Sequence, residues 1–114
     1  MVDFVDFLPT LADLAKTYLP QNSSDGISFY RQLFGVDDSV RHWSYCYYNP
    51  YIPAFNNLRR WVQDTTYKLY DNGNFINMKL DKNETHPINA GRLTTEEVTI
   101  KNHFQYLLDS LPTR

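Results

Sequence analysis

The stretch that decides the fold lies in the second half of the chain and reads Tyr67-Lys68-Leu69-Tyr70-Asp71-Asn72-Gly73-Asn74-Phe75-Ile76-Asn77-Met78. At its centre, Asn72-Gly73 separates two runs in which apolar and polar residues alternate. A type I′ turn needs positive φ at both central residues, and Asn-Gly meets that need, so the pattern predicts a β-hairpin. A two-residue loop would pair the strands as follows: Tyr70 with Phe75, Leu69 with Ile76, and Tyr67 with Met78.

This register predicts a sheet with two different faces. One face would carry the apolar residues Tyr67, Leu69, Ile76, Met78 and Leu80. The other would be mostly polar and carry Thr66, Lys68, Tyr70, Phe75, Asn77 and Lys79. An antiparallel sheet with one solvated side shows this difference between its faces. The apolar face needs a cover, and we expect the last segment of the chain to provide it.

That last segment has the pattern of an amphipathic helix. Thr94 and Glu97 have the spacing of a capping box, with Thr94 as the N-cap and Glu97 at the third helical position. The residues after them place one apolar face toward the sheet: Ile100, Phe104, Leu107, Leu108 and Leu111. Pro112 is expected to end the helix.

The chain begins with two predicted helices. The first covers residues 4–19, with Asp3 or Asp6 capping its start and Pro20 ending it. The second is short and runs from Ser28, its cap, to Leu33 or Phe34, and Gly35 closes it.

Two further strands and two loops complete the predicted elements. The strands are 41–48, which is rich in aromatic residues, and 59–63; the hairpin strands are 66–70 and 74–80. Loops are expected at 49–57 and 81–91. The fold class is therefore α+β, with an antiparallel sheet of about four strands covered on one face by the C-terminal helix and preceded by one long and one short N-terminal helix. We place a boundary between an N-terminal helical segment, 1–36, and a sheet-plus-helix subdomain, 37–114.

Composition excludes several classes of function. The chain has 114 residues and a net charge of −2 with scattered basic residues, which argues against a nucleic-acid partner. No apolar run approaches the roughly 20 residues that cross a bilayer, so no membrane partner is expected. The N-terminus lacks the pattern of a secretory signal. Cys46 is the single cysteine, which excludes an internal disulfide and a cysteine zinc pair.

No pattern of catalytic residues emerges from composition and spacing. The three histidines, His42, His86 and His103, have no metal-binding spacing, and Cys46 is expected to be a small buried residue in a strand. The sequence has no Gly-rich phosphate loop, no G-x-S-x-G and no H-E-x-x-H. Basic residues beside tryptophan at 41–43 and 59–61 could hold an anion, and a solvated strand edge is the alternative. The candidate substrate contacts are Arg41, His42, Tyr48, Arg59 and Arg60.

The order of the motifs resembles the sulfatase family, arylsulfatase type, of the alkaline-phosphatase superfamily. Residues 5–15 are similar to its helix D-x-x-P-T-L-x-x-L-A-G, and 25–35 to its D-G-x-S-x-x-P-x-L-x-G. Residues 41–43 resemble its entry into the C-terminal sheet. The hairpin and the loop after it resemble three further motifs: Y-K-L-I at 67–70, x-L-Y-D-L at 75–78 and D-P-x-E at 81–84. The chain departs from the family at Lys16, where glycine is usual, at Lys82, where proline is usual, and at Gln63, where arginine is often found.

The resemblance implies that this chain is the C-terminal portion of a sulfatase. In that family a Cys/Ser-x-Pro-x-Arg motif supplies a formylglycine nucleophile, and calcium is bound beside it, both in a larger N-terminal domain. Residues 46–50 do not match that motif. The resemblance therefore implies no catalytic residue, metal or cofactor in this chain, with formylglycine and calcium in the full-length parent. It also makes 1–36 the end of the catalytic domain, and it suggests a periplasmic or extracellular location.

The expected partners follow from the same resemblance. They are the N-terminal sulfatase catalytic domain and, in the parent, a sulfated sugar or aryl sulfate ester. The apolar stripe of the first helix would face that domain, so here it would fold back on the sheet or contact a second copy in a homodimer. Two alternatives stay open: a freestanding aromatic-rich carbohydrate-binding or interaction module using Tyr51 and Phe55, and a parent phosphatase or phosphonate esterase.

Overall fold

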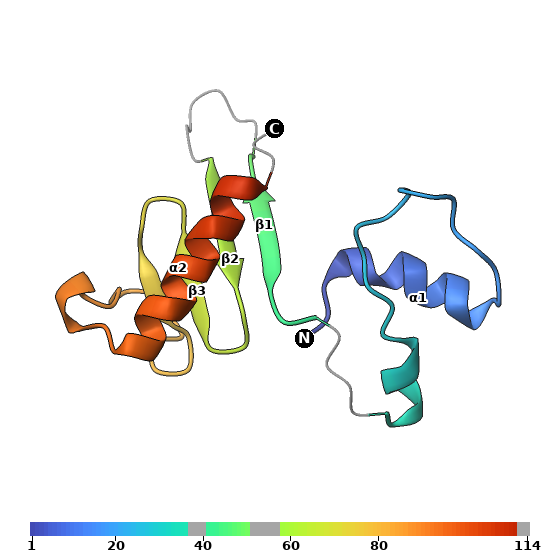
Figure 1. Cartoon of the computed structure of the whole chain (residues 1–114), viewed down its shortest axis with the longest axis horizontal. Helices are drawn as coiled ribbons and strands as arrows, with labels where there is room; N and C mark the ends of the chain where they lie inside the picture. The colour runs from blue at the N-terminus through green and yellow to red at the C-terminus, as the bar shows by residue number, and fades with distance from the viewer. Residues whose placement is uncertain (37–40, 51–57, 112–114) are drawn as a thin grey trace. The chain divides into compact units, whose positions relative to one another are not determined.

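The structure is a computed structural model that describes residues 1–36, 41–50 and 58–111 (Figure 1). Its elements, in chain order, are η1 (Phe4–Asp6), α1 (Phe7–Leu14), η2 (Tyr30–Phe34), β1 (Ser44–Tyr48), β2 (Arg59–Gln63), β3 (Tyr67–Tyr70), β4 (Phe75–Asn77), η3 (Ala90–Arg92) and α2 (Thr95–Ser110). Contacts divide the chain into two compact units, Met1–His42 and Trp43–Arg114. Each unit is described by itself.

The C-terminal unit is an antiparallel meander covered by a helix. The strands lie in the order β1-β2-β3-β4, and α2 runs across one face of the sheet (Figure 1). The buried core joins the two layers and consists of Val62, Leu69, Phe75, Phe104, Leu107 and Leu108. The predicted α+β fold, with a four-stranded sheet under a C-terminal helix, is confirmed.

The helix begins as its sequence predicts. The backbone N–H of Glu97 donates to Thr94 Oγ1 over 3.2 Å, and the N–H of Thr94 donates to Glu97 Oε2 over 2.8 Å. Both bonds of the capping box are therefore present. Ile100 and Leu111 pack against the edge of the core, so the predicted apolar face of the helix is confirmed.

The hairpin forms at the predicted place but in a different register. Leu69 pairs with Phe75 and Lys68 with Ile76. This register differs by one residue from the one expected for a two-residue loop, in which Leu69 would pair with Ile76. The N–H of Gly73 donates to the Tyr70 carbonyl, and Gly73 alone of the central Asn-Gly pair has positive φ, at 87°. The loop is thus Asp71-Asn72-Gly73, a three-residue loop with its left-handed residue at Gly73 rather than a type I′ turn.

The shift by one residue exchanges the faces of the last strand. Phe75, expected on the polar face, lies in the core under α2, and Ile76, expected in that core, is buried on the opposite face. The strand also ends at Asn77 rather than at Leu80. The Asn77 side chain accepts the N–H groups of residues 79 and 80 and turns the chain, and Leu80 is 85% exposed. The predicted burial of Leu80 is wrong.

In the N-terminal unit, the first helix is shorter than predicted. A 3₁₀ turn capped by Asp3 leads into α1, which ends at Leu14 instead of continuing to residue 19. Lys16 adopts a φ of 53°, and the N–H groups of Lys16 and Thr17 donate to the carbonyls of Asp13 and Ala12. This is a Schellman motif, which reverses the chain before Pro20 is reached.

The second predicted helix is a 3₁₀ helix whose start is also corrected. Phe29, without a side-chain cap, precedes η2, and Ser28 instead accepts the N–H of Tyr30 in a local turn. Its end is as predicted, because Gly35 closes it with a φ of 79°.

One buried polar cluster ties the N-terminal unit together. The Asp6 carboxylate accepts the N–H of Ile27 over 2.8 Å and binds Arg41 through two hydrogen bonds. Thr10 Oγ1 accepts the N–H of Phe29 over 3.0 Å. A Cβ on Gly26 would lie 2.0 Å from the carbonyl oxygen of residue 5, so only glycine fits. The residues shared with the sulfatase motifs in this unit are therefore those that hold its segments together.

Candidate substrate-binding face

The candidate site lies on the face of the sheet opposite α2. Because side chains alternate along a strand, the residues between those of the core point to this face. They include Tyr48 on β1, Arg59 and Trp61 on β2, and Lys68 and Tyr70 on β3. The register pairs Tyr48 with Arg59 and Trp61 with Tyr70. The five side chains therefore lie on neighbouring strands.

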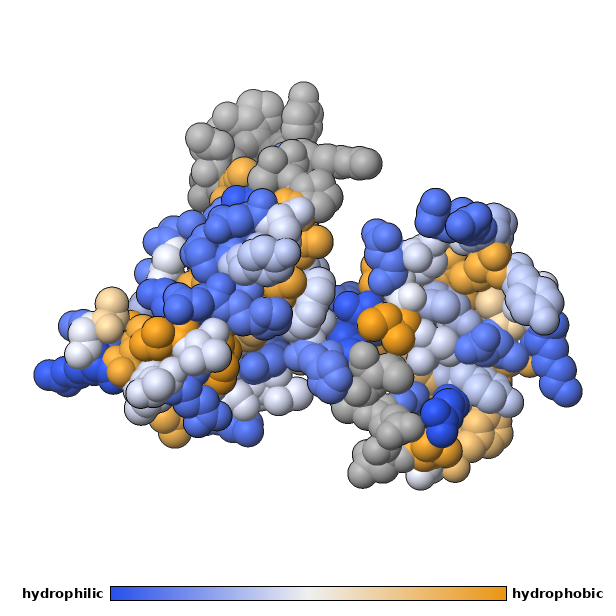
Figure 2. Space-filling model, in the orientation of Figure 1, coloured by the Kyte–Doolittle hydropathy of each residue, from blue (hydrophilic) through white to orange (hydrophobic). Residues whose placement is uncertain are grey.

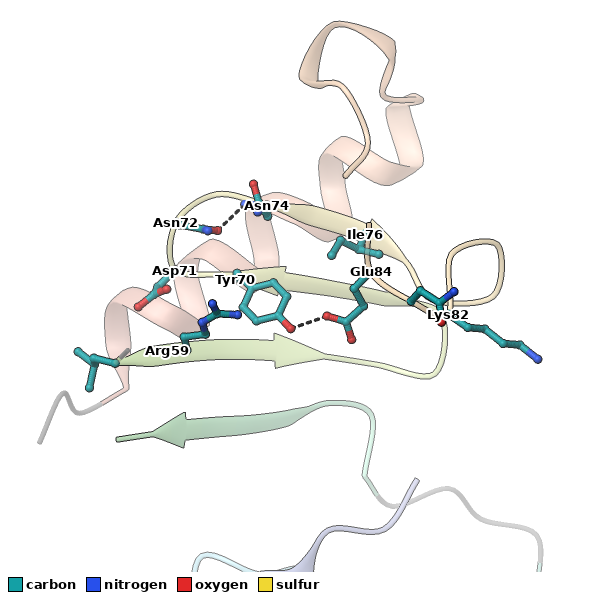
Figure 3. Close-up of a pocket in the computed structure, with 10 residues that line it drawn as sticks. Arg59, Tyr70, Asp71, Asn72, Asn74, Ile76, Lys82 and Glu84 are labelled. Atoms are coloured by element: carbon teal, nitrogen blue, oxygen red, sulfur yellow. Dashed lines mark hydrogen bonds between the residues drawn. The ribbon is translucent and has the colours of Figure 1, made fainter. Parts of the chain in front are cut away.

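Lys68, Glu84 and Tyr70 form a partly buried polar cluster on this face. Lys68 Nζ lies 2.8 Å from Glu84 Oε1, and the Tyr70 hydroxyl donates to Glu84 Oε2 in a short hydrogen bond (Figure 3). The ammonium also lies 4.5 Å from the ring centroid of Trp61 and 4.6 Å from that of Tyr70. Lys68 is only 7% exposed, so its charge is neutralised by Glu84 and by the two rings.

The loop after β4 brings Glu84 to the sheet. Asp81 accepts the N–H of His86 over 2.7 Å and the hydroxyl of Thr85 over 3.4 Å, which folds the loop on itself. Within this loop Glu84 has a φ of 56°, a left-handed conformation that non-glycine residues rarely adopt. The folded loop thus carries the Glu84 carboxylate back to Lys68 on β3.

The cluster holds fixed protonation states near neutral pH. Burial acts to raise the pKa of Glu84, but hydrogen bonds from Lys68 and Tyr70 lower it overall. Burial opposes the charge of Lys68, but the bonds to Glu84 and Tyr70 raise its pKa overall. Burial and Glu84 raise the pKa of Tyr70, which keeps the phenol protonated as a donor.

Two hollows adjoin the cluster. The larger, about 550 Å³, is mainly polar, and its lining includes Arg59, Tyr70, Asn72, Asn74, Ile76 and Glu84. Figure 3 shows the side chain of Lys82, which also borders this hollow, pointing away from it. The smaller, about 320 Å³, is lined by Tyr48, Arg59, Trp61 and Tyr70. Arg59 and Tyr70 thus border both hollows.

The structure brings two of the five predicted contact residues together. Tyr48 and Arg59 face each other across β1 and β2 and line the same hollow. Arg60 points to the opposite face, where its Nε lies 3.5 Å from Asp71 Oδ2 and its Nη1 donates to the Leu108 carbonyl over 3.4 Å.

The other two predicted contacts, Arg41 and His42, belong to the N-terminal unit. Arg41 is 8% exposed, with its guanidinium against Asp6, while His42 is exposed. Asp6 and the hydrogen bond between them raise the pKa of Arg41, against the effect of burial. The guanidinium of Arg41 therefore supports the fold of its own unit.

Sequence reasoning missed Lys68, Glu84 and Trp61 as members of the site. A signal for the first two was present, because Lys68 belongs to the Y-K-L motif and Glu84 to the D-P-x-E motif. The structure shows that these two motifs meet in one ion pair. The proposed aromatic platform at Tyr51 and Phe55 lies outside the described residues.

The described residues do not fit a sulfatase calcium site. Within residues 1–36, 41–50 and 58–111, no three or more His, Cys, Asp or Glu side chains gather as metal ligands would. Cys46 lies half-buried on β1, opposite Trp61. Over the same described ranges, no helix combines the length and the hydropathy needed to span a membrane.

The N-terminal unit exposes the apolar stripe of its first helix. Phe4 is 86% and Leu11 58% exposed, and Figure 2 shows hydrophobic residues in separate patches among hydrophilic ones on the surface of this unit. A shallow apolar hollow of about 500 Å³ lies between this stripe and residues 23–25. Contact of the stripe with a second copy stays a prediction.

Comparison with known proteins places this fold among the sulfatases. No family model and no curated protein matches the sequence. Solved structures do match. The 2-O GAG sulfatase BT1596 is 27% identical with a TM-score of 0.68, and a putative sulfatase from Bacteroides thetaiotaomicron VPI-5482 is 26% identical with a TM-score of 0.67. BT4656, solved with its substrate D-glucosamine-2-N,6-O-disulfate, shares the fold at 23% identity and a TM-score of 0.69.

The share of each chain that matches is unequal. The alignments cover 91% of this chain but 23% of BT1596 and of the putative sulfatase, and 22% of BT4656. The chain thus spans about a quarter of the length of the sulfatases it matches. The resemblance predicted from the motif series is confirmed: over 91% of its length the chain is similar to sulfatases, as a C-terminal portion of one would be.

Proposed function

We propose that this chain acts as the C-terminal subdomain of a sulfuric ester hydrolase, where it packs on a catalytic domain and shapes the mouth of the substrate cleft. The observation that carries this proposal is the match to sulfatases over 91% of this chain and 23% of theirs. The ion pair of Lys68 and Glu84 supports it, because it joins two segments that the sulfatase motifs single out.

The chemistry of ester hydrolysis would come from the rest of such an enzyme. Sulfate-ester cleavage depends on a positioned nucleophile and on stabilisation of negative charge in the transition state. In the family a formylglycine and calcium supply these, and the donor groups described above do not form a site for either. The residues of this chain would instead contact the part of the substrate that does not react.

An aryl sulfate assay tests this division of labour. Purified chain, with calcium added, is expected to hydrolyse 4-methylumbelliferyl sulfate no faster than a blank without protein. Calcium-dependent turnover that purifies with the chain would contradict the proposal. Cys46→Ala serves as the matched control, because any turnover that it abolishes would come from this thiol and not from a contaminant.

A second candidate function is a freestanding carbohydrate-binding module. It is favoured by the aromatic side chains of Tyr48, Trp61 and Tyr70, which line one hollow on the sheet. Such a module would bind unsulfated as well as sulfated glycans through ring stacking. Equal affinity of the chain for a matched sulfated and unsulfated sugar would therefore favour this candidate over a sulfatase subdomain.

A further inference from the structure

We propose that the sheet face opposite α2 carries a subsite for an anionic saccharide, in which Arg59 binds the anionic group and Tyr48, Trp61 and Tyr70 border the sugar ring. The proposal rests on the proposed function for the class of ligand. It adds where on this chain the ligand lies and which charge recognises it.

Two basic side chains of the strands, Lys68 and Arg59, lie on this face, and they differ in whether an acidic side chain pairs with them. Lys68 is buried, paired with Glu84 and stacked on two rings, so its positive charge is already satisfied. Arg59 is exposed, and its guanidinium forms no hydrogen bond or ion pair within the described part of the chain. A planar guanidinium donates bidentate hydrogen bonds to sulfate or carboxylate. Recognition of an anion on this face therefore falls to Arg59.

The surroundings of Arg59 also support the proposal. On one side lies the hollow bordered by the aromatic side chains of Tyr48, Trp61 and Tyr70. On the other lies the polar hollow whose lining includes Asn72, Asn74 and Asn83. Amide side chains offer both donors and acceptors, which suits hydroxyl groups, and aromatic surfaces suit the apolar face of a sugar ring. An anionic sugar could contact all three kinds of group: the guanidinium, the amides and the aromatic rings. A bare anion could bind only the guanidinium.

The rigidity of the aromatic wall supports the proposal as well. The rings of Trp61 and Tyr70 lie 5.7 Å apart, Lys68 Nζ contacts both rings, and Glu84 fixes the Tyr70 hydroxyl. The wall is thus held by packing and hydrogen bonds on β2 and β3 rather than by a mobile loop. A preformed surface of this kind loses little conformational entropy when a ligand binds.

Amide-shift titration of the ¹⁵N-labelled chain tests the proposal. The probes are N-acetylglucosamine 6-sulfate, N-acetylglucosamine and sodium sulfate. The variants are Arg59→Ala, Arg59→Lys and, as the matched control, Arg92→Ala, whose exposed guanidinium belongs to η3. We expect the sulfated sugar to shift amides of β2 and of the 71–74 loop. We expect Arg59→Ala to weaken binding about tenfold or more and Arg92→Ala to leave it within about twofold.

Four outcomes would overturn the subsite: no shifts, shifts away from this face, shifts that persist in Arg59→Ala, or sodium sulfate binding as tightly as the sulfated sugar. Partial recovery of binding in Arg59→Lys supports recognition by charge. The aryl sulfate assay measures hydrolysis and does not depend on binding to the sheet face opposite α2. If the titration shows no binding and the chain is inactive in the assay, the subsite proposal is contradicted and the proposed function is not.

Discussion

The Arg41 guanidinium forms a bidentate pair with the Asp6 carboxylate, with Nε 2.7 Å from Oδ2 and Nη2 2.5 Å from Oδ1, and both residues are at least nine-tenths buried. The same carboxylate accepts the N–H groups of Asp3 and Ile27. One side chain thus joins the first turn, the 25–29 segment and the end of the N-terminal unit. The fold of this unit therefore depends on the Asp6 carboxylate.

Replacing Asp6 by asparagine should destabilise the N-terminal unit by about 3–5 kcal/mol, because it removes the carboxylate charge that faces the buried Arg41 guanidinium. The measurement is amide hydrogen exchange at Ile27 and Phe29, whose N–H groups Asp6 and Thr10 accept. Asp13→Asn, at an exposed position on α1, is the control and should leave exchange unchanged. Equal protection of Ile27 in both variants would refute the role of Asp6.

The same carboxylate should make this unit sensitive to acid. Burial opposes its ionisation, but the Arg41 hydrogen bond and the N–H groups of Ile27 and Asp3 lower the pKa of Asp6 from 3.8 to about 2. Because the pKa of Asp6 is lower in the folded than in the unfolded state, the stabilisation is complete above about pH 5 and is lost progressively as the pH falls through 2 toward about 1. The loss amounts to about 2 kcal/mol. Amide exchange corrected for intrinsic rates should show it, and Asp6→Asn should remove the dependence.

Lys16→Gly should stabilise the chain. Lys16 occupies the left-handed position of the Schellman motif, where a side chain costs about 1–2 kcal/mol and glycine costs none. The greater entropy of glycine in the unfolded chain offsets part of this, which leaves a gain of about 0.5–1 kcal/mol. Lys16→Ala removes the charge but keeps the strain and should be neutral. If urea unfolding ranks alanine and glycine equally, the backbone explanation fails.

Glu84→Gln should destabilise the C-terminal unit by about 2–4 kcal/mol, because Lys68 would keep a buried charge without a carboxylate. Trp43 and Trp61 both belong to this unit, so urea unfolding followed by tryptophan fluorescence reports on it. Glu96→Gln, at an exposed position in the first turn of α2, is the control. Adding Lys68→Met to Glu84→Gln should recover part of the loss, and a further loss would contradict the pairing.

Phe75 and Leu80 separate the observed hairpin register from the two-residue loop. In the structure Phe75 is 1% and Leu80 85% exposed. Phe75→Ala should therefore cost about 3–5 kcal/mol and Leu80→Ala less than about 0.5 kcal/mol. The register with the two-residue loop would bury Leu80 under the helix and place Phe75 on the polar face. A larger loss of stability in Leu80→Ala than in Phe75→Ala, measured by denaturant unfolding, would therefore favour that register.

The elements that the sequence predicts well are those set by local patterns. The Thr94–Glu97 capping box, the apolar face of α2 and the presence of four strands all depend on patterns of neighbouring residues. The hairpin register does not, because Asp71-Asn72-Gly73 is compatible with a two-residue and a three-residue loop, and both place Gly73 at positive φ. The choice depends on whether Phe75 or Ile76 fills the core, which is a property of the packed unit.

Local sequence patterns do not predict where α1 ends or which residues form the site. Without a glycine at residue 16, no local signal marked the reversal of the chain there. Lys68 and Glu84 are sixteen residues apart and meet only because the Asp81 loop folds back onto β3. The sequence neighbours of Arg41 predict a substrate contact, whereas the carboxylate that it binds, that of Asp6, lies thirty-five residues away in the chain.

The most direct test of the central claim is a chimera. In the 2-O GAG sulfatase, the segment that matches this chain is replaced by residues 1–114, and hydrolysis of that enzyme's own substrate is compared with that of a variant in which the segment is deleted. A folded chimera that turns over substrate faster than the deletion variant is the predicted result. A chimera that folds and yet is no more active than the deletion variant would contradict the equivalence of this chain to a sulfatase C-terminal portion.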